Sequence, residues 1–267
     1  MAPHIQLTRQ SGGKLLVVFL LTAACLTAGA ESETNRLFAA RAEAEFHRAY
    51  NQFQSATNDP AAAWQLGRTC FDFAEFATND TQRAAIARQG IGACQQLLAR
   101  DTNSAPGHYY LAMNYGQLAR AEAPSLAAYK LVKEMEREFK TAATLDGDFD
   151  YAGPARCLGL LYRDAPVWPF SIGSRRKARE WLERAVKLAP DYPENRLNLA
   201  ESRLKWNDRN GAESELKTLD TLWPKAQTNF VGEAWESSWA DWAARKKAAE
   251  QSFAQTSEPA ESPKAHH

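Results

Sequence analysis

The chain has 267 residues, of which 45% are hydrophobic and 24% charged, and its 32 basic side chains balance 32 acidic ones. This composition predicts a soluble domain with a sizeable core. A net charge near zero, without a basic stripe carrying interleaved aromatic residues, argues against nucleic-acid binding. It also gives no general attraction to an anionic membrane.

Residues 1–30 are predicted to be a signal peptide. A weakly basic start (His4, Arg9, Lys14) precedes an apolar run, Leu15 to Leu26, of signal-peptide length. The small residues at 28–30 form a cleavage site, so we expect cleavage after Ala30 and a periplasmic or secreted chain.

An alternative for this segment is lipidation. The run Thr22-Ala23-Ala24-Cys25 resembles a lipobox, although Thr22 stands where leucine is usual. In that case Cys25 would carry the lipid and become the new N-terminus. Membrane attachment is expected only if Cys25 is lipidated.

Three cysteines follow the signal peptide: Cys70, Cys94 and Cys157. An odd number cannot form a complete intramolecular framework, although Cys70 and Cys94 fall on successive predicted helices and could bridge. The favoured interpretation is that each is a small buried apolar residue. No Cys-x2-Cys spacing occurs, so no metal site is expected.

A 34-residue period organises the rest of the chain. The run Leu158-Gly159-x2-Tyr162 opens one unit, and its second half recurs in the next unit. The matching positions are Ala178 and Ala212, Leu182 and Leu216, Ala185 and Leu219, and Pro190 and Pro224. This is the tetratricopeptide signature: small residues let two helices approach closely, and proline stops the second helix.

The same pattern upstream predicts four repeats, at residues 60–104, 105–149, 152–192 and 193–226. The first three are lengthened between their paired helices, and the segment from Lys130 to Thr141 is expected to be a helix extending past the solenoid. A helix over 32–57 is predicted to precede the repeats.

A last helix over 228–252 is predicted to cap the stack. Its Trp235, Trp239 and Trp242 lie on one face, which favours a cap over a sugar or ligand platform. Residues 254–267 have the composition of a disordered tail. The prediction is therefore an all-α, tetratricopeptide-type α-solenoid of about ten helices within residues 31–253.

Catalytic constellations are not apparent in the sequence. His47 and His108 are the histidines between the signal peptide and the terminal pair, and no metalloprotease, nucleophile-elbow or phosphate-loop motif occurs. Gly153-Pro154 could offer amides to an anion, but a close-packed turn is favoured. Neither an enzyme nor a cofactor is expected.

A protein partner is the expected ligand. The first helices of this repeat line a concave groove, and aromatic, Met and Arg side chains there are typical of protein interfaces. The predicted groove residues are Trp64, Arg68, Asp72, Tyr109, Met113, Gln117, Arg156, Arg163, Trp168 and Glu201. Alternatively, Trp64 and Tyr109 pack on the first helix or the C-terminal tail and cover the groove.

The loop between the helices of the third repeat carries Trp168 between two prolines, which exclude a helix there. We expect Trp168 to fold back onto the groove or the next repeat. An exposed interaction anchor is the alternative.

These residues carry a family resemblance. The run Gly153-Pro-Ala-Arg-x-Leu-Gly159, the loop Pro166-x-Trp-Pro169, Gly173, and the run from Leu182 to Pro190 resemble the periplasmic tetratricopeptide T component of TRAP-type transporters. The resemblance covers roughly Cys70 to Ala226.

The resemblance implies an exported, often lipid-anchored scaffold that assembles with a periplasmic solute-binding protein and can form homo-oligomers. Arg156 and the Trp168 loop match the family pattern. The function expected from the sequence is therefore non-enzymatic binding of a protein partner through the concave face. The alternative is a carrier of a lipid or organic acid in an apolar pocket between the groove and the Trp168 loop.

Overall fold

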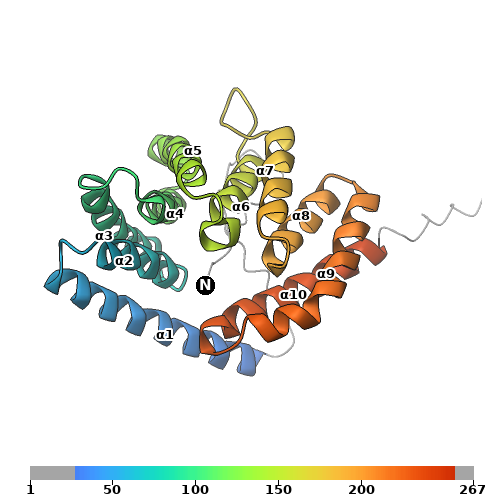
Figure 1. Ribbon diagram of the computed structural model, residues 1–267, viewed down its shortest axis with the longest axis horizontal. Helices are drawn as coiled ribbons and strands as arrows, with labels where there is room; N and C mark the ends of the chain where they lie inside the picture. Colours follow the sequence, from blue (N-terminus) through green and yellow to red (C-terminus); the bar gives the residue numbers. More distant parts are fainter. Residues whose placement is uncertain (1–27, 256–267) are drawn as a thin grey trace, which may run out of the picture. The chain divides into compact units, whose positions relative to one another are not determined.

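The computed structural model describes the backbone of residues 28–255 and the side chains of 33–254. This part of the chain forms ten helices (Figure 1): α1 (Ala28–Ser55), α2 (Pro60–Ala74), α3 (Asp80–Leu98), α4 (Ala105–Ala121), α5 (Leu126–Leu145), α6 (Phe149–Asp164), α7 (Arg175–Leu188), α8 (Pro193–Lys205), α9 (Arg209–Asn229) and α10 (Glu233–Gln255). The all-α prediction is confirmed.

Some sequence predictions fall outside the described residues. They are the signal-peptide features within 1–27, among them the lipobox with Cys25, and the tail from 256 onward. The described chain divides into two compact units, one ending at Leu188 and the other starting at Ala189. The first unit holds α1–α7 and the second holds α8–α10.

The first unit contains α1 and three antiparallel helix pairs. In each pair the second helix packs on its own first helix, and α3 and α5 also contact the first helix of the following pair. The first helices contact one another, because α4 packs against both α2 and α6. They therefore form a shared layer, which we call the inner layer, as expected for a solenoid.

Capping residues start several of these helices. The Asp59 carboxylate accepts a hydrogen bond from the Ala61 amide at 2.9 Å, with Pro60 in the first turn. The side chains of Asn79, Ser104 and Ser125 cap α3, α4 and α5 in the same way. The starts of these helices are thus encoded locally, by the residues that cap them.

Small residues set the junction of the first two pairs. Asn114 Nδ2 donates to the Gly67 carbonyl at 2.7 Å and to the Tyr110 carbonyl at 2.8 Å. A Cβ on Gly90 would lie 2.5 Å from Asn114 Oδ1, and one on Gly67 would overlap Cys94 Sγ. The amide of Asn114 therefore fits only where residue 90 is glycine, while glycine at position 67 makes room for Cys94.

Among the described residues, Cys70, Cys94 and Cys157 form no disulfide. Cys70 and Cys94 are both 0% exposed, which confirms the favoured interpretation that they are buried apolar residues. The alternative of a Cys70–Cys94 disulfide is wrong for this structure. Burial raises the pKa of the Cys94 thiol to about 12, so it stays protonated.

The second unit is a helix pair closed by α10, which packs on both α8 and α9. Trp242 is fully buried and meets Tyr192 edge to face, with ring centroids 5.3 Å apart. Trp239 Nε1 donates to the Phe230 carbonyl at 2.6 Å. The tryptophan face thus packs into this unit's core, which confirms the capping interpretation and not the ligand platform.

Several predicted boundaries need correction. Helix α9 runs through Pro224 to Asn229, because its apolar face continues past the proline to the buried Ala226. The first helix starts at Ala28 instead of 32, and the last occupies 233–255 instead of 228–252.

The segment predicted to extend past the solenoid packs within it. It belongs to α5, whose Met135 and Phe139 are 3% and 0% exposed. Among the described helices, none combines the length and apolar character needed to cross a bilayer.

Candidate functional site

The predicted groove residues differ widely in exposure. Four are buried: Tyr109, Met113, Gln117 and Arg156. Five are partly buried: Trp64, Arg68, Asp72, Arg163 and Glu201. Only Trp168 among the ten is exposed. The contacts of these residues divide them into an interlocked group at the start of α6, a group that ties helices together, and the Trp168 loop.

The start of α6 is a left-handed turn. Asp150, Tyr151 and Ala152 have φ values of 51°, 54° and 63°, before regular helix begins at Gly153. Non-glycine residues seldom adopt this conformation, because Cβ then crowds the following carbonyl oxygen. Three in succession store strain, which persists only where surrounding contacts hold the backbone in place.

Arg156 holds this turn from within. Its Nη1 donates to the carbonyl oxygens of Asp150 and Tyr151 at 3.3 and 3.1 Å, and its Nη2 lies 3.0 Å from Asp150 Oδ2. The Arg156 side chain is 2% exposed and that of Asp150 12%. Each buried charge therefore has an opposite charge and hydrogen bonds beside it.

Tyr109 on α4 completes the arrangement by donating from Oη to Asp150 Oδ2 at 2.8 Å. Burial, and then the Asp150 carboxylate, raise the pKa of Tyr109, so its hydroxyl remains a donor. A Cβ on Gly153 would lie 2.8 Å from Tyr109 Oη, so this close approach requires glycine. The turn is thereby tied to the neighbouring repeat.

Aromatic rings join three repeats at this point. Trp64 on α2 stacks on Tyr110 on α4, with centroids 5.9 Å apart and planes 8° from parallel. Phe149 on α6 meets Trp64 and Tyr109 edge-on at 6.4 and 5.4 Å. Such ring pairs add specific geometry to apolar burial, so they fix the inner layer from α2 to α6.

Arg68 and Asp72 lie one turn apart on α2, with Nε and Oδ2 separated by 3.7 Å. Burial raises the pKa of Asp72 to about 6, and the Arg68 charge opposes this rise. The negative charge of Asp150 raises it further, which places this carboxyl in the electrostatic field of the α6 turn. A quarter of the Asp72 side chain, 25%, remains exposed, so this is the polar edge of the interlocked group.

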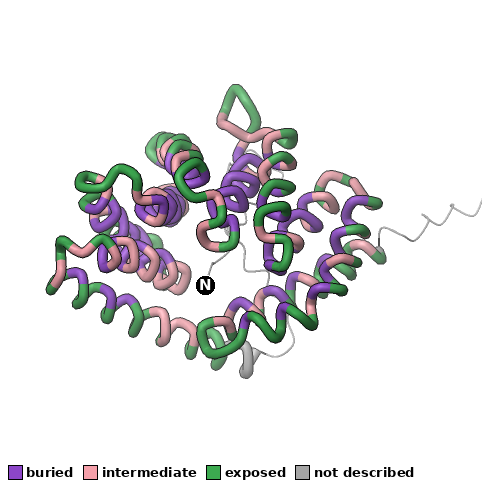
Figure 2. Tube along the Cα trace, in the orientation of Figure 1, coloured by how far each residue is buried: buried purple, intermediate pink, exposed green. Residues whose placement is uncertain are grey.

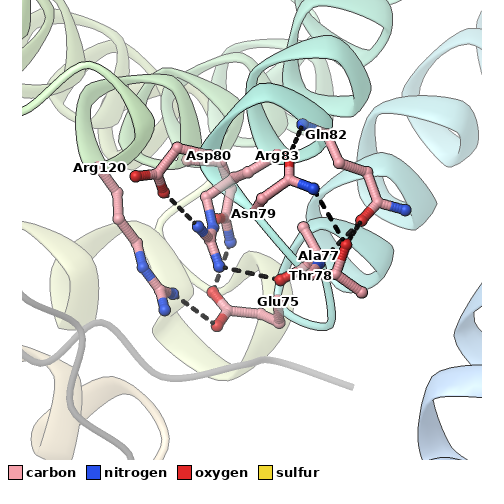
Figure 3. Close-up of polar contacts among 9 residues, drawn as sticks. Glu75, Ala77, Thr78, Asn79, Asp80, Gln82, Arg83 and Arg120 are labelled. Carbon is pink, nitrogen blue, oxygen red and sulfur yellow. Dashed lines mark hydrogen bonds and ion pairs between the residues drawn. The ribbon is translucent and has the colours of Figure 1, made fainter.

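Gln117 ties helices together at Glu75, whose ion pair with Arg120 is drawn in Figure 3. Its Nε2 donates to Glu75 beyond the C-terminus of α2, and Arg120 Nη1 lies 3.2 Å from the same carboxylate. Burial raises the pKa of Glu75, while Arg120 opposes that shift. Within the described residues Gln117 Oε1 is buried without a hydrogen-bond partner.

Arg163, Met113 and Glu201 are also held by neighbours. Arg163 forms a two-point contact with Asp164, at 2.9 and 2.6 Å. Met113 Sδ lies 3.7 Å from Cys157 Sγ. Glu201, in the second unit, receives Arg245 of α10 at 2.8 and 2.7 Å, so it anchors the capping helix.

The Trp168 loop, residues 165–174, contradicts the expectation that its tryptophan folds back. Trp168 is 83% exposed, Phe170 73% and Val167 65%. Figure 1 shows the loop projecting beyond the ends of α6 and α7. Because the prolines exclude a helix, the loop has no continuous apolar face that could pack these rings against the protein. The exposed-anchor alternative agrees with the structure.

Hydrogen bonds close this loop at its base. The Gly173 amide donates to the Pro166 carbonyl at 2.7 Å, and the Ser174 amide donates to the Tyr162 carbonyl at 2.8 Å. Val167 and Gly173 form an isolated bridge. The tip therefore projects from a base that is closed by backbone hydrogen bonds.

Sequence reasoning found Trp64, Tyr109 and Arg156 but missed the residues that join them. Asp150 and Phe149 were not selected, because an aspartate before a helix resembles an ordinary cap. The signal that could have revealed them is Gly153 directly before Pro154, which indicates a crowded helix start. Among the described residues there is no cluster of His, Cys, Asp and Glu that could hold a metal ion.

Comparison with solved structures shows the fold. A tetratricopeptide protein of Thermus thermophilus, TTC0263, aligns with a TM-score of 0.55 at 20% identity, covering 83% of this chain and 99% of that one. MamA aligns with a TM-score of 0.48 at 15% identity, covering 76% of this chain and 98% of its own. No protein-family model matches the sequence, and no curated protein matches it. The alignment with TTC0263 and the ten helices of the described residues show that the chain has the fold of a tetratricopeptide-type α-solenoid.

Proposed function

We propose that this chain is an exported repeat scaffold that binds a protein partner through the inner layer of its first unit. The observation that carries the proposal is the interlocked group. Aromatic and charged residues from α2, α4 and α6 are fixed against one another across three repeats, with Trp64, Arg68 and Asp72 at the partly exposed edge. Rigid aromatic and arginine side chains are the usual anchors of protein interfaces.

The partner we propose is a periplasmic solute-binding protein of a TRAP-type transporter. Support comes from the resemblance of residues 153–190 to the T component of these transporters and from the signal-peptide pattern of residues 1–30. Lipidation at Cys25 would attach the scaffold to a membrane, and cleavage after Ala30 would release it. The strained turn suits a binding role, because strain of this kind is retained where a surface must be held ready.

A small-ligand carrier is less well supported. That alternative needs an apolar pocket closed by the Trp168 loop, and the 83% exposed Trp168 does not close one. No observation on the described residues therefore favours the carrier alternative.

The test is a pull-down from periplasmic extract by the immobilised chain, with identification of retained proteins by mass spectrometry. Arg68→Glu reverses a charge on α2 of the inner layer. Arg88→Glu is the matched control, because this arginine also faces one carboxylate, Glu122 at 2.8 Å, but lies on the outer helix α3. We expect a solute-binding protein to be retained by the native chain and by the control, and retention to fall at least tenfold with Arg68→Glu.

Unfolding curves of both variants check that the fold is intact. Retention of the same protein by both variants would place the partner elsewhere on the chain. Retention of no solute-binding protein by the native chain at micromolar concentration would refute the transporter assignment.

A further inference from the structure

We propose that the Trp168 loop and the basic start of α7 together insert into the surface of an anionic lipid bilayer. This membrane contact is independent of lipidation at Cys25 and of the partner proposed for the inner layer. Three observations carry it: the apolar tip, the hydrogen bonds within the loop, and the charge of the helix that follows.

The tip offers three large apolar side chains to solvent at one projecting point. Val167, Trp168 and Phe170 are 65%, 83% and 73% exposed (Figure 2). Large exposed apolar patches mark sites of protein or membrane interaction. Tryptophan is especially suited to the interface between headgroups and acyl chains, because its ring is apolar and its N–H is polar.

The backbone of the tip is prepared for an apolar medium. Unpaired amides are costly in a bilayer, because no water is available to bond them. Here Phe170 and Ser171 both donate to the Val167 carbonyl, at 3.1 and 3.4 Å, and Gly173 donates to Pro166 at 2.7 Å. Pro166 and Pro169 have no amide hydrogen. Three amides of the loop are thus paired and two positions carry none, which lowers the cost of moving the loop into the interface.

The helix that follows is strongly basic. Its sequence, Arg175 to Leu188, contains six basic residues (Arg175, Arg176, Lys177, Arg179, Arg184 and Lys187) and two acidic ones besides (Glu180 and Glu183). Its first turn contains no acidic residue. Positive charge in a first turn opposes the helix dipole, and here it is retained beside the loop, with Arg176 also paired with Glu180 and Lys177 lying over the Tyr162 ring.

Anionic headgroups complement this arrangement. Basic residues beside a membrane-inserted segment each strengthen binding to anionic lipid by roughly fivefold. The zero net charge of the chain is therefore compatible with membrane binding, because the positive charge is concentrated beside the apolar tip.

A bilayer fits these observations better than a protein pocket does. A pocket selects the shape of one side chain, whereas an interface accepts any apolar group and responds to the total apolar surface. Three adjacent apolar side chains on a projecting loop, followed by basic residues, match the second case. Exchange of Trp168 for another large apolar residue distinguishes the two.

The experiment is sedimentation of the full chain with vesicles. Cys25→Ser is present throughout so that lipidation cannot contribute. The vesicles contain either phosphatidylcholine alone or a mixture with phosphatidylglycerol. We expect binding to the anionic vesicles, at least tenfold weaker binding of Trp168→Ser with Phe170→Ser, and wild-type binding of Trp168→Leu.

The matched control is Val231→Ser, because Val231 is 65% exposed, as Val167 is, but lies in the turn before α10. It should bind like the native chain. Vesicles with brominated acyl chains give a second readout: tryptophan quenching should be smaller in Trp168→Leu than in the native chain, although both bind.

Three results would overturn the proposal. They are no binding of the native chain to anionic vesicles, binding that survives the double serine variant, and binding equal on neutral and anionic vesicles. A different outcome would identify the loop as an anchor for a protein. In that case the native chain would not bind vesicles, and a protein that it retains in the pull-down would be lost with both Trp168→Ser and Trp168→Leu.

Discussion

The two ends of helix α6 differ in what surrounds their side chains. At its start, a strained left-handed turn is enclosed by Arg156, Tyr109 and aromatic rings from two neighbouring repeats. At its end, the chain leaves the helix for a loop whose Trp168 and Phe170 face solvent. The side chains at the start pack within the protein, and those of the loop at the end face solvent.

Along this helix, the start is thus held by contacts within the protein, and the end is open to contacts outside it. Changes at the start should first alter the free energy of unfolding, because each group there has partners within the chain. Changes at the end should leave folding intact and alter only what the loop contacts. The predictions below test this contrast.

The largest effect is expected at Arg156. Replacing it with Met leaves the Asp150 carboxylate buried without its cation and removes donors from the strained turn. Loss of one member of a buried ion pair costs about 3–5 kcal/mol of unfolding free energy. Urea unfolding measures this. Arg176→Met is the control, since its side chain is 74% exposed and its pair with Glu180 should contribute less than about 1 kcal/mol.

The strain itself can be measured with a matched pair of alanines on α6. Ala152, at φ 63°, and Ala155 are 0% and 1% exposed, so Ala→Gly removes an equally buried methyl from both. Ala152→Gly also relieves a left-handed alanine, a gain of about 1–2 kcal/mol. Ala155→Gly instead adds about 0.5–1 kcal/mol of helix cost. We expect unfolding free energies to differ by about 2 kcal/mol in favour of Ala152→Gly, and equal values would show that the turn is unstrained.

The third prediction concerns pH. Burial raises the pKa of Asp72 to about 6 in the folded chain, above the usual 3.8. The folded state therefore takes up this proton before the unfolded state does, and stability gains from it as pH falls between these values. Relative to Asp72→Asn, the native chain should gain about 1–2 kcal/mol in unfolding free energy from about pH 7 to about pH 4. A carboxyl carbon shift for Asp72 that titrates near its usual pKa of 3.8 would contradict this.

The smallest effect is expected at the loop. Trp168→Ser with Phe170→Ser should change the unfolding free energy by less than about 0.5 kcal/mol, because exposed side chains without packing partners contribute little. Urea unfolding beside Arg156→Met provides the comparison. A large loss of stability would show that the two ends of α6 are coupled.

The helices could be predicted from the sequence because repeats are local. A 34-residue period and the small residues of its signature, such as Gly159 and Ala178, act through near neighbours. These signals located four helix pairs and the capping helix. The exception was Pro224, where packing on both sides of the proline carried α9 on to Asn229.

The site was less predictable, because its contacts join residues far apart in sequence. Phe149 meets Trp64 across two repeats, and nothing near Asp150 marks a left-handed turn except Gly153. The direction of Trp168 could not be predicted either. It depends on whether the interior has space for the ring, which a sequence does not show.

The junction at Asn114 has an evolutionary consequence. Its amide occupies space that exists only because Gly90 lacks a side chain, and it satisfies the carbonyl of Gly67, whose own lack of a side chain makes room for Cys94. A change at one of the three positions alone would leave an overlap or a lost hydrogen bond. We therefore expect these positions to covary among homologous chains, which would identify the true descendants of this repeat junction even where overall similarity has faded.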